Sequence, residues 1–388
     1  MMNRRVCVVG LGYIGLPLAS LLTIAGHTVT GVDINPEVLA RISSHLHQEP
    51  EPELNELVNK ALNTGNLSLS LSLIPAEIYI ITVGTPLTPE KLPDLSHVNQ
   101  AVDSILTFLQ PGNAVFIEST CPIGTTSAIA AKINQCCPNI LVAYCSERVL
   151  PGNIIKELVH NSRVIGGVDP SSTQEAVKFY QTFVRGEVVA TDAKTAEAVK
   201  LAENTYRDIN IAYANELSLL SHSLGIDSNE VIALANRHPR VDILKPGIGV
   251  GGHCIAIDPW FLVAAEPRWG QLTAKAREVN ETKTKWVIQN IKSLMQENGA
   301  STVACLGLTY KPNVSDTRES PAMAIVAALR QDFIVHAVDP FVAEGDLIDT
   351  AIEASSLIIV LVAHEQFKKY FANKKCNKQI IDYTGECL

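Results

Sequence analysis

Residues 5–19 read Arg5-Val-Cys-Val-Val-Gly10-Leu-Gly12-Tyr-Ile-Gly15-Leu-Pro-Leu-Ala19, and this stretch decides the fold of the 388-residue chain. A β-branched run leads into glycines spaced G-x-G-x-x-G, and a helix-compatible apolar stretch follows. A second predicted strand, 27–33, ends at Asp33, which lies 23 residues after Gly10 (33 − 10 = 23). A carboxylate about 20 residues after such a turn binds an adenosine ribose. The pattern predicts a Rossmann-like dinucleotide-binding half; a glycine-rich turn of another α/β protein is the alternative.

More buried-strand runs follow at 78–83, 114–118 and 140–144, separated by helix-compatible stretches such as 94–109. Strands that alternate with helices predict a parallel, doubly wound sheet. Ligands bind at the carboxyl ends of the strands in such a sheet. We therefore expect the polar residues at these strand ends to line a site, namely Thr85, Glu118, Thr120, Ser146 and Glu147.

A long helix is predicted over 191–223, because apolar residues recur at helical spacing without Gly or Pro. Lys200 and Asn204 are four residues apart, so they share one face of this helix. Taken from the helix alone, a solvated face is the ordinary interpretation of such a pair, and a binding face is the alternative. A second helical stretch covers 271–299.

The start of the chain recurs near its end, because Val6-Cys-Val-Val-Gly10-Leu-Gly-Tyr13 resembles Val303-Ala-Cys-Leu-Gly307-Leu-Thr-Tyr310. We predict an α/β fold of two Rossmann-like, doubly wound parallel-sheet domains, 1–190 and 300–388, joined by a central helical region, 191–299. The second copy carries Lys311, Asn313 and Arg318 where the first has apolar residues. This difference predicts a different phosphate-bearing ligand, held by cationic side chains. A degenerate half kept for packing alone is the alternative.

Between the helical stretches lies a loop that ends on Cys254, with His253 beside it and Asp258 four residues later. Four glycines precede the cysteine and free the backbone to approach a ligand closely: Gly247, Gly249, Gly251 and Gly252. A thiolate nucleophile needs a neighbouring cation, for which Lys200 and His253 are the candidates. A nicotinamide cofactor beside such a cysteine indicates oxidation through an aldehyde, a thiohemiacetal and a thioester. A purely structural cysteine is the alternative.

Composition excludes several classes of protein. The formal net charge of −9 argues against a general attraction to nucleic acid or to an anionic membrane surface. Nine cysteines without CxxC or a paired Cys/His spacing favour free thiols in a reducing cytoplasm and predict no metal site. The apolar run 6–25 resembles a signal peptide but is better explained by the glycine turn, and no other run reaches the roughly 18 apolar residues of a membrane span. We expect a cytoplasmic protein.

Together these motifs resemble the UDP-glucose/GDP-mannose dehydrogenase family, over about residues 6–383. The resemblance rests on the Gly10 turn, Glu118-Ser-Thr120-Cys-Pro-Ile-Gly124, Ser146-Glu147-Arg148, the Lys200 helix, the Cys254 loop and Gly307-Leu-Thr-Tyr310-Lys311 through Arg318. The segment Asn236-Arg-His-Pro-Arg240-Val resembles the branch that oxidises UDP-N-acetyl-D-mannosamine at C6 to the uronate, a precursor of surface polysaccharide. Many relatives have proline where this chain has Ser146.

The resemblance implies a four-electron oxidation that uses two NAD molecules in turn. It implies that Cys254 is the nucleophile and that Lys200 and Asn204 hold the reacting oxygen or a water near C6. Asp258 matches an acid that assists proton removal. Glu147 and Thr120 match residues that hold the water of thioester hydrolysis.

The resemblance also implies binding residues. For NAD they are Gly10, Gly12, Tyr13, Ile14, Gly15, Asp33, Thr85, Glu118 and Arg318. For the UDP-sugar they are Glu147, Arg148, Lys200, Asn204, Arg240, Lys245, Gly249, Gly251, His253, Tyr310 and Lys311. Arg240 resembles an arginine that reaches across a homodimer interface to the neighbouring substrate site. Asp33 favours NAD over NADP, because a carboxylate would repel a 2′-phosphate.

Two alternatives stay open for the function. The same chemistry could act on UDP-N-acetylglucosamine or UDP-glucose, because the shape of the pocket reads the configuration at C2. A sugar-nucleotide sensor without turnover is the other alternative, although binding alone would not require a thiol beside a nicotinamide.

Overall fold

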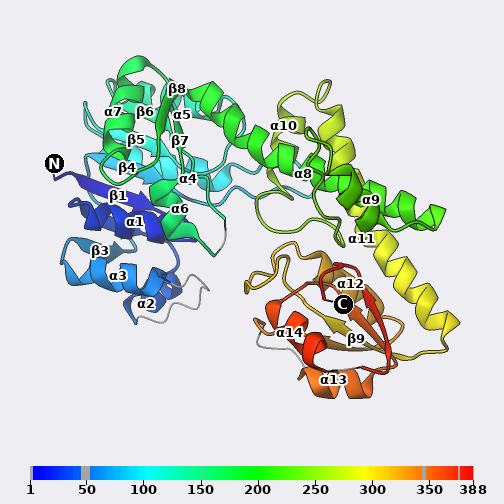
Figure 1. The fold of residues 1–388 in the computed structure, drawn as a ribbon. Coiled ribbons are helices and arrows are strands. Elements are labelled where there is room, and N and C mark those ends of the chain that lie inside the picture. Colours follow the sequence, from blue (N-terminus) through cyan, green and yellow to red (C-terminus); the bar gives the residue numbers. More distant parts are fainter. Residues whose placement is uncertain (1–2, 45–52, 151, 343–346, 375, 388) are drawn as a thin grey trace. The chain divides into compact units, whose positions relative to one another are not determined.

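The computed structural model describes residues 3–44, 53–150, 152–342, 347–374 and 376–387 (Figure 1). The chain forms two compact units, Met1–Glu203 with Trp260–Ala265 and Asn204–Pro259 with Glu266–Leu388. Each unit contains one β-sheet, so the predicted α/β fold with two Rossmann-like sheets is confirmed. The three-part division at 190 and 299 stays a prediction.

The first unit is built on an eight-stranded sheet in the order β3-β2-β1-β4-β5-β6-β7-β8 (Figure 1). Neighbouring strands are parallel except β6 and β7, which are antiparallel. The strand order reverses between β1 and β4, and such a switch point is where doubly wound sheets bind ligands. The strands are β1 (Arg5–Val9), β2 (Thr28–Val32), β3 (Leu67–Ser70), β4 (Ile78–Ile81), β5 (Ala114–Ile117), β6 (Leu141–Tyr144), β7 (Arg163–Gly167) and β8 (Val188–Asp192).

Helices cover both faces of this sheet, which explains why its strands read as continuous apolar runs. Val6 and Val8 of β1 face a core shared with α1, α3, α6 and α7. Cys7 and Val9 face the opposite core, shared with α4 and α5. The helical elements are α1 (Gly15–Ile24), α2 (Pro36–Ser43), α3 (Leu54–Asn63), α4 (Ser96–Ile105), the 3₁₀ helix η1 (Leu106–Phe108), α5 (Thr125–Cys136), α6 (Ile154–His160) and α7 (Pro170–Tyr180).

The helices in the middle of the sequence are α8 (Ala193–Leu224), α9 (Ser228–Ala235), α10 (Asp258–Ala265) and α11 (Gln271–Glu297). The two long helices predicted over 191–223 and 271–299 are therefore confirmed to within two residues at each end, which is the usual uncertainty of a helix boundary. The helix α8 begins in the first unit and ends in the second.

The second unit contains a parallel four-stranded sheet in the order β10-β9-β11-β12 (Figure 1). Val303 and Cys305 of β9 face a core with α11 and α12, and Ala304 and Leu306 face a core with α13 and α14. The repeated glycine segment therefore starts a second strand covered on both faces. The elements are β9 (Thr302–Leu306), α12 (Pro321–Leu329), β10 (Ile334–Val338), α13 (Ile348–Ala354), β11 (Leu357–Val360), α14 (Glu365–Asn373) and β12 (Gln379–Asp382).

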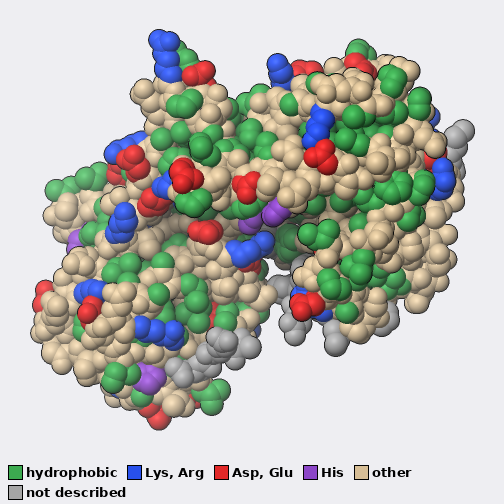
Figure 2. Space-filling model, turned by 180° about the vertical axis from the view of Figure 1, so that it is seen from behind, with side chains coloured by type: hydrophobic (Ala, Val, Ile, Leu, Met, Phe, Trp, Pro, Cys, Tyr) green, Lys and Arg blue, Asp and Glu red, His purple; other side chains and the backbone are tan. Residues whose placement is uncertain are grey.

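Side chains of both charges are scattered over the face shown in Figure 2. Among the residues that the structure describes, no helix combines the length and apolar character that crossing a membrane requires.

Candidate active site

The glycine turn after β1 has the geometry that a dinucleotide requires. Gly10 has φ +97°, and a Cβ on Gly15 would lie 1.8 Å from the carbonyl oxygen of Gly10. A Cβ on Gly12 would meet no atom within 4 Å, so this side of the turn is open. Ile14 precedes α1 without a side-chain cap; in the first turn, the amide of Leu16 donates to the carbonyl oxygen of Gly12 at 3.2 Å, and Pro17 has no amide hydrogen.

Asp33 follows β2 and accepts a hydrogen bond from the amide of Leu11, with 2.9 Å between Oδ2 and N. This bond ties the predicted ribose carboxylate to the glycine turn. The loops after β4 and β5 also meet, because the hydroxyl of Thr85 donates to the carbonyl oxygen of Thr120 at 2.8 Å. The structure thus ties Asp33 to the glycine turn and brings Thr85 and Thr120 together at strand ends.

Glu118 lies differently from the expectation that it lines the cofactor cleft. Its side chain is 1% exposed, and its Oε1 accepts from Arg163 at 2.5 Å and from the hydroxyl of Tyr180 at 2.7 Å. The guanidinium also stacks over the Tyr180 ring. Burial raises the pKa of the Glu118 carboxyl against the opposing charge of Arg163. This carboxylate belongs to a buried ion pair in the first unit, and its role toward NAD stays a prediction.

Lys200 and Glu147 form a buried ion pair, with 3.0 Å between Nζ and Oε1. The ammonium also donates to the carbonyl oxygen of Glu147 at 2.8 Å, and Oε2 accepts from the amide of Val149 at 2.5 Å. Lys200 is 7% exposed. The solvated helix face that α8 alone suggests is therefore wrong for Lys200, because the loop after β6 covers it.

The residues around this ion pair enclose a small cavity of about 10 Å³. Arg148 lines it and pairs with Glu203, with 3.0 Å between Nε and Oε2. Ser146 lines it too and is 5% exposed, and its hydroxyl has no hydrogen-bond partner among the described residues. The volume is at the lower limit for one water molecule.

In the second unit, Asn204 donates to Asp258, with 2.6 Å between Nδ2 and Oδ2. The amide of Asp258 donates to the carbonyl oxygen of Cys254 at 2.8 Å, so the cysteine lies directly before the first turn of α10. Asp258 is buried, whereas Cys254 is exposed. Three residues predicted to be catalytic are therefore joined within this unit.

The glycines before Cys254 also pack closely against protein atoms, and their approach to a ligand stays a prediction. A Cβ on Gly249 would lie 2.1 Å from Oγ1 of Thr284, and one on Gly252 would lie 2.8 Å from the ring of Tyr310. A Cβ on Gly251 would lie 2.5 Å from a backbone carbonyl oxygen. These three glycines let the loop pack tightly against its own unit, and only Gly247 faces open space.

Arg318 is the cation that acts on the cysteine within the second unit. Its guanidinium binds Asp316, and this hydrogen bond is the main cause of the raised pKa of Arg318; the charges of Asp316, Tyr310 and Cys254 raise it further. His253 was a predicted partner for the thiolate, but burial and then Arg318 lower the pKa of its imidazole and favour the neutral form. Burial, together with the charges of Asp316 and Cys254, raises the pKa of Tyr310 to about 12.

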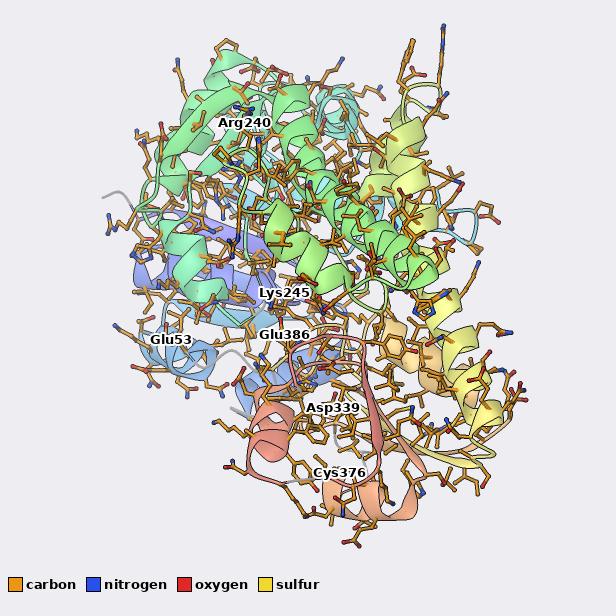
Figure 3. The ribbon with its side chains drawn as sticks, turned by 45° about the vertical axis from the view of Figure 1, so that its right-hand side comes forward. Glu53, Arg240, Lys245, Asp339, Cys376 and Glu386 are labelled. Carbon is orange, nitrogen blue, oxygen red and sulfur yellow. The ribbon has the colours of Figure 1, made fainter. Side chains whose placement is uncertain are left out.

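The remaining predicted cations have different surroundings. Lys245 donates to Glu386 at 2.6 Å, and both are labelled in Figure 3. Arg240, also labelled there, is exposed. Lys311 is half-buried. Among the described residues, neither Arg240 nor Lys311 forms an ion pair, so both are available to an anionic group.

The structure contains a series of polar contacts between α8 and α11, here called the polar ladder, which the sequence did not predict. Asp208 accepts from Arg277 at 2.7 Å and from Asn280 at 2.8 Å, and Asn280 in turn accepts from Asn215. The Oδ1 of Asn215 then accepts from the amide of Gly247 at 2.8 Å. The ladder thus holds the start of the cysteine loop. Polar residues within the buried stripes of both helices were the available signal.

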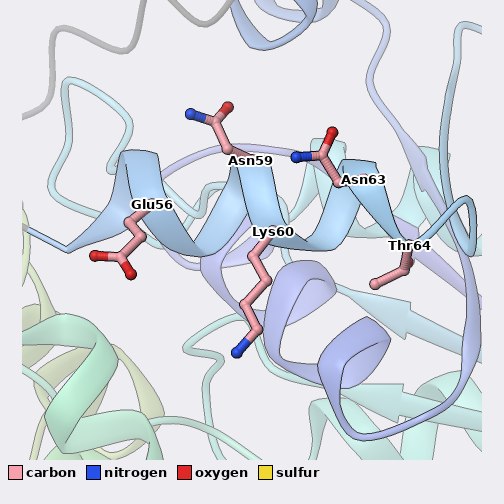
Figure 4. A pocket seen from close by; sticks show the side chains of 5 residues that line it. All are labelled: Glu56, Asn59, Lys60, Asn63 and Thr64. Atoms are coloured by element: carbon pink, nitrogen blue, oxygen red, sulfur yellow. The ribbon is translucent and has the colours of Figure 1, made fainter.

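A larger hollow, about 710 Å³, lies along α3 (Figure 4). Its lining side chains come from this one helix and the residue after it, namely Glu56, Asn59, Lys60, Asn63 and Thr64. Most of these side chains are exposed to solvent, so the hollow contributes nothing to the site.

A dinucleotide turn, a second Rossmann-like sheet and an exposed cysteine under the influence of a cation define a nucleotide-binding oxidoreductase. The chain belongs to the UDP-glucose/GDP-mannose dehydrogenase family, whose NAD binding domain matches residues 4–184, central domain 194–282 and UDP binding domain 304–385. It is thus an NAD-dependent nucleotide-sugar dehydrogenase, as the resemblance implied.

Individual relatives are similar over nearly the whole chain. The UDP-N-acetyl-D-mannosamine dehydrogenase of Methanocaldococcus jannaschii is 46% identical and covers 98% of this chain and 92% of its own. The NDP-N-acetyl-D-galactosaminuronic acid dehydrogenase of Ralstonia nicotianae is 40% identical, with 98% and 96% covered. The solved structure of UDP-D-ManNAc dehydrogenase from Pyrococcus horikoshii has a TM-score of 0.92, with 38% identity and 98% and 95% covered.

Proposed function

We propose that this chain oxidises C6 of UDP-N-acetyl-D-mannosamine to the carboxylate, with Cys254 as the nucleophile. The exposed thiol before α10, under the influence of Arg318, carries the proposal. The names of the relatives from Methanocaldococcus jannaschii and Pyrococcus horikoshii support this substrate. The uronate would serve the synthesis of surface polysaccharide.

The reaction removes two hydrides from one carbon. The C6 alcohol loses a hydride and a proton to give an aldehyde, and Sγ of Cys254 adds to it to form a thiohemiacetal. Loss of the second hydride from C6 and of the proton from the hydroxyl group gives a thioester, and water then breaks the carbon–sulfur bond to release the carboxylate and the thiol. NAD, when bound, accepts one hydride in each oxidation.

Each unit supplies its own groups to this proposal. Lys200, held by Glu147, would stabilise negative charge on the reacting oxygen. Glu147 and Thr120 would orient the water of hydrolysis. The side-chain amide of Asn204 holds the carboxylate of Asp258 through a 2.6 Å hydrogen bond, and this carboxylate would accept a proton from the substrate.

The cofactor fits the first unit. Gly12 leaves room for a pyrophosphate beside the uncapped start of α1, and Asp33 would accept the ribose hydroxyls. This carboxylate favours NAD over NADP. In the second unit, Lys311 would bind the diphosphate of the sugar nucleotide, because among the described residues no acid pairs with it.

We further propose a cytoplasmic homodimer whose central helical region, 191–299, supplies the interface. Tyr206, Tyr213 and Leu220 recur every seven residues on α8 and are 69%, 52% and 51% exposed, and Leu224 at the end of the helix is 70% exposed. An apolar stripe of this kind is typical of a helix that binds a partner. Arg240 would reach the neighbouring substrate site. Nine free thiols support a reducing compartment.

The substrate test follows NADH at 340 nm and counts the NADH formed per sugar consumed, with UDP-N-acetylmannosamine, UDP-N-acetylglucosamine and UDP-glucose in parallel. We expect about two NADH per sugar and the highest kcat/KM for the mannosamine derivative. About one NADH would contradict the thioester route, and fastest oxidation of UDP-glucose would contradict the substrate. No turnover with any sugar would favour a sensor. Because the Ralstonia relative is named an NDP-N-acetyl-D-galactosaminuronic acid dehydrogenase, an N-acetylgalactosamine nucleotide is a further sugar to include.

A further inference from the structure

Both Rossmann-like halves have an aspartate after their second strand, Asp33 in the first half and Asp339 in the second, but the surroundings of the two side chains differ. In the first half, Asp33 after β2 accepts the amide of Leu11 on Oδ2 and the amide of Asn35 on Oδ1. In the second, Asp339 after β10 accepts the amide of Leu308 at 2.6 Å on Oδ2 and the amide of Phe341 at 2.8 Å on Oδ1. The two carboxylates therefore hold equivalent turns.

Their accessibility separates the two acids. Asp33 is half-buried, whereas the side chains of Asp339 and His364 are both 0% exposed. His364 Nε2 lies 3.0 Å from Oδ2 of Asp339, and Figure 3 labels the acid inside its unit. His364 lies four residues after the end of β11, and Thr85 lies four residues after the end of the equivalent strand β4. His364 therefore covers the carboxylate of Asp339, at the position where the carboxylate of a dinucleotide site binds a ribose.

The other ring nitrogen of His364 holds the loop after β9. The amide of Asn313 donates to Nδ1 at 2.9 Å, and the side-chain oxygen of Asn313 accepts from the amide of Glu365 at 3.0 Å. An amide donor at Nδ1 requires that nitrogen to be an acceptor, so the proton of the neutral ring lies on Nε2, toward Asp339. Asn313 has φ +61°, a left-handed conformation that this pair of hydrogen bonds compensates.

The same ring also reaches the backbone of Lys311. Its Nε2 lies 3.3 Å from the hydroxyl oxygen of Thr309, and this hydroxyl donates to the carbonyl oxygen of Lys311 at 2.9 Å. Hydrogen bonds thus hold the backbone at the half-buried residue Lys311 and at Asn313. Side-chain entropy is then the main freedom that this lysine loses when it binds an anion.

We propose that His364 is a positioning residue for nucleotide binding: the link from its Nδ1 to the amide of Asn313 holds the loop 308–314, which presents Lys311 to the diphosphate of the sugar nucleotide, while Asp339 only orients the ring. The proposal rests on the proposed function for the identity of the ligand. It assigns His364 no contact with the ligand.

Two substitutions separate the contacts of the ring. His364→Asn keeps an oxygen near the position of Nδ1, where it can accept from Asn313, and loses the donor to Asp339. His364→Gln keeps a donor near the position of Nε2 and loses the acceptor for Asn313. His336→Gln is the matched control, because this histidine lies on β10 of the same sheet outside the link.

The first measurement is UDP binding by calorimetry with the full-length protein, with NAD binding as the internal reference. We expect His364→Gln to weaken UDP at least about tenfold and His364→Asn less than about threefold, with NAD affinity unchanged in both. Unchanged UDP affinity in both variants overturns the proposal, as does equal weakening in both, which would indicate packing. If only His364→Asn weakened UDP binding, the effect would come from the contact with Asp339, and this result would also overturn the proposal.

The second measurement does not depend on the ligand. Amide hydrogen exchange of a peptide spanning 308–318 should be faster in His364→Gln than in the wild type and in His336→Gln. If the wild type does not bind UDP but this exchange rises, the proposed ligand is wrong and the link stands. Unchanged exchange overturns the link.

A third substitution covers a failure of the buried variants to fold. Asn313→Gly changes an exposed residue, tolerates the positive φ and removes the acceptor for Glu365. We expect the loop to exchange faster and UDP affinity to fall at least about threefold. Wild-type exchange and affinity in this variant would again contradict the proposal.

Discussion

At the scale of single residues, exposure separates Cys254 from the cysteines of the sheets. Burial raises the pKa of Cys7 and of Cys305 to about 12, so both thiols stay protonated at neutral pH. Cys254 is exposed and lies within electrostatic range of Arg318. Exposure alone is not sufficient, because Cys136 is exposed too and lies at the end of α5.

Cys254→Ala should therefore bind UDP and NAD normally and lose uronate formation by about 1000-fold or more, because the covalent route needs the thiolate. Steady-state NADH formation and calorimetry measure the two effects. Cys136→Ala is the matched control and should keep wild-type turnover. Normal turnover of the Cys254 variant would contradict the covalent mechanism.

Ser146 allows a test of what a buried hydroxyl without a hydrogen-bond partner costs in stability. Its buried hydroxyl has no partner among the described residues, and such a group costs roughly 1–3 kcal/mol. Ser146→Ala should increase the free energy of unfolding by about 1 kcal/mol, measured by urea denaturation. Ser223→Ala, on an exposed position of α8, should change it by less than about 0.5 kcal/mol. A loss of stability in Ser146→Ala would indicate that a water satisfies the hydroxyl in the small cavity.

At the scale of elements, α8 and α11 pack through polar groups as well as apolar ones. Lys283 on α11 is 5% exposed, donates to the hydroxyl of Ser218 on α8 at 2.6 Å and lies over the ring of Trp286. Within the described residues no carboxylate forms an ion pair with it. Burial lowers the pKa of its ammonium to about 8. The helix pair therefore contains a charge whose burial opposes folding.

Lys283→Met should stabilise the protein at pH 7 by about 1–3 kcal/mol, because it removes the cost of burying a charge. Between about pH 8 and the ordinary lysine pKa, the folded wild type releases this proton while the unfolded chain keeps it. The unfolded state then binds more protons, so the stability that Lys283 costs is recovered as pH rises. The advantage of the variant should accordingly shrink from pH 7 to pH 10 in thermal melts. Lys285→Met, exposed on the same helix, should show no such trend; an equal gain at both pH values would contradict this explanation.

At the scale of the whole molecule, the proposed homodimer depends on the apolar stripe of α8. Leu224→Glu should convert the dimer to a monomer in light scattering coupled to size exclusion, because a buried carboxylate at an interface is costly. Leu71→Glu places the same charge at a 54% exposed position of the first unit and should leave the dimer intact. A wild-type monomer, or an intact dimer in the Leu224 variant, would contradict this interface.

The arrangement of the two sheets could be predicted because its signals are local. The glycines after β1, the β-branched runs and the repeat at Gly307 specify strand, turn and helix through backbone conformation alone. The spacing of Asp33 predicted its position at the turn, which the 2.9 Å hydrogen bond to Leu11 confirms. The sequence did not show which protein atoms the glycines of the cysteine loop pack against, because a glycine does not reveal which neighbour occupies the place of its missing Cβ.

By itself, the sequence determined two Rossmann-like halves, the dinucleotide turn and the loop that carries Cys254, because each depends on neighbours within a few residues. Only the tertiary structure decided the partners of the polar side chains. Lys200 pairs with Glu147 across 53 residues, and Asn204 binds Asp258 across 54. Likewise, His364 reaches Asp339 and Asn313 only because β9, β10 and β11 pair side by side. Strand order and helix packing determine these contacts between distant residues, and a periodic pattern along the chain predicts neither of them.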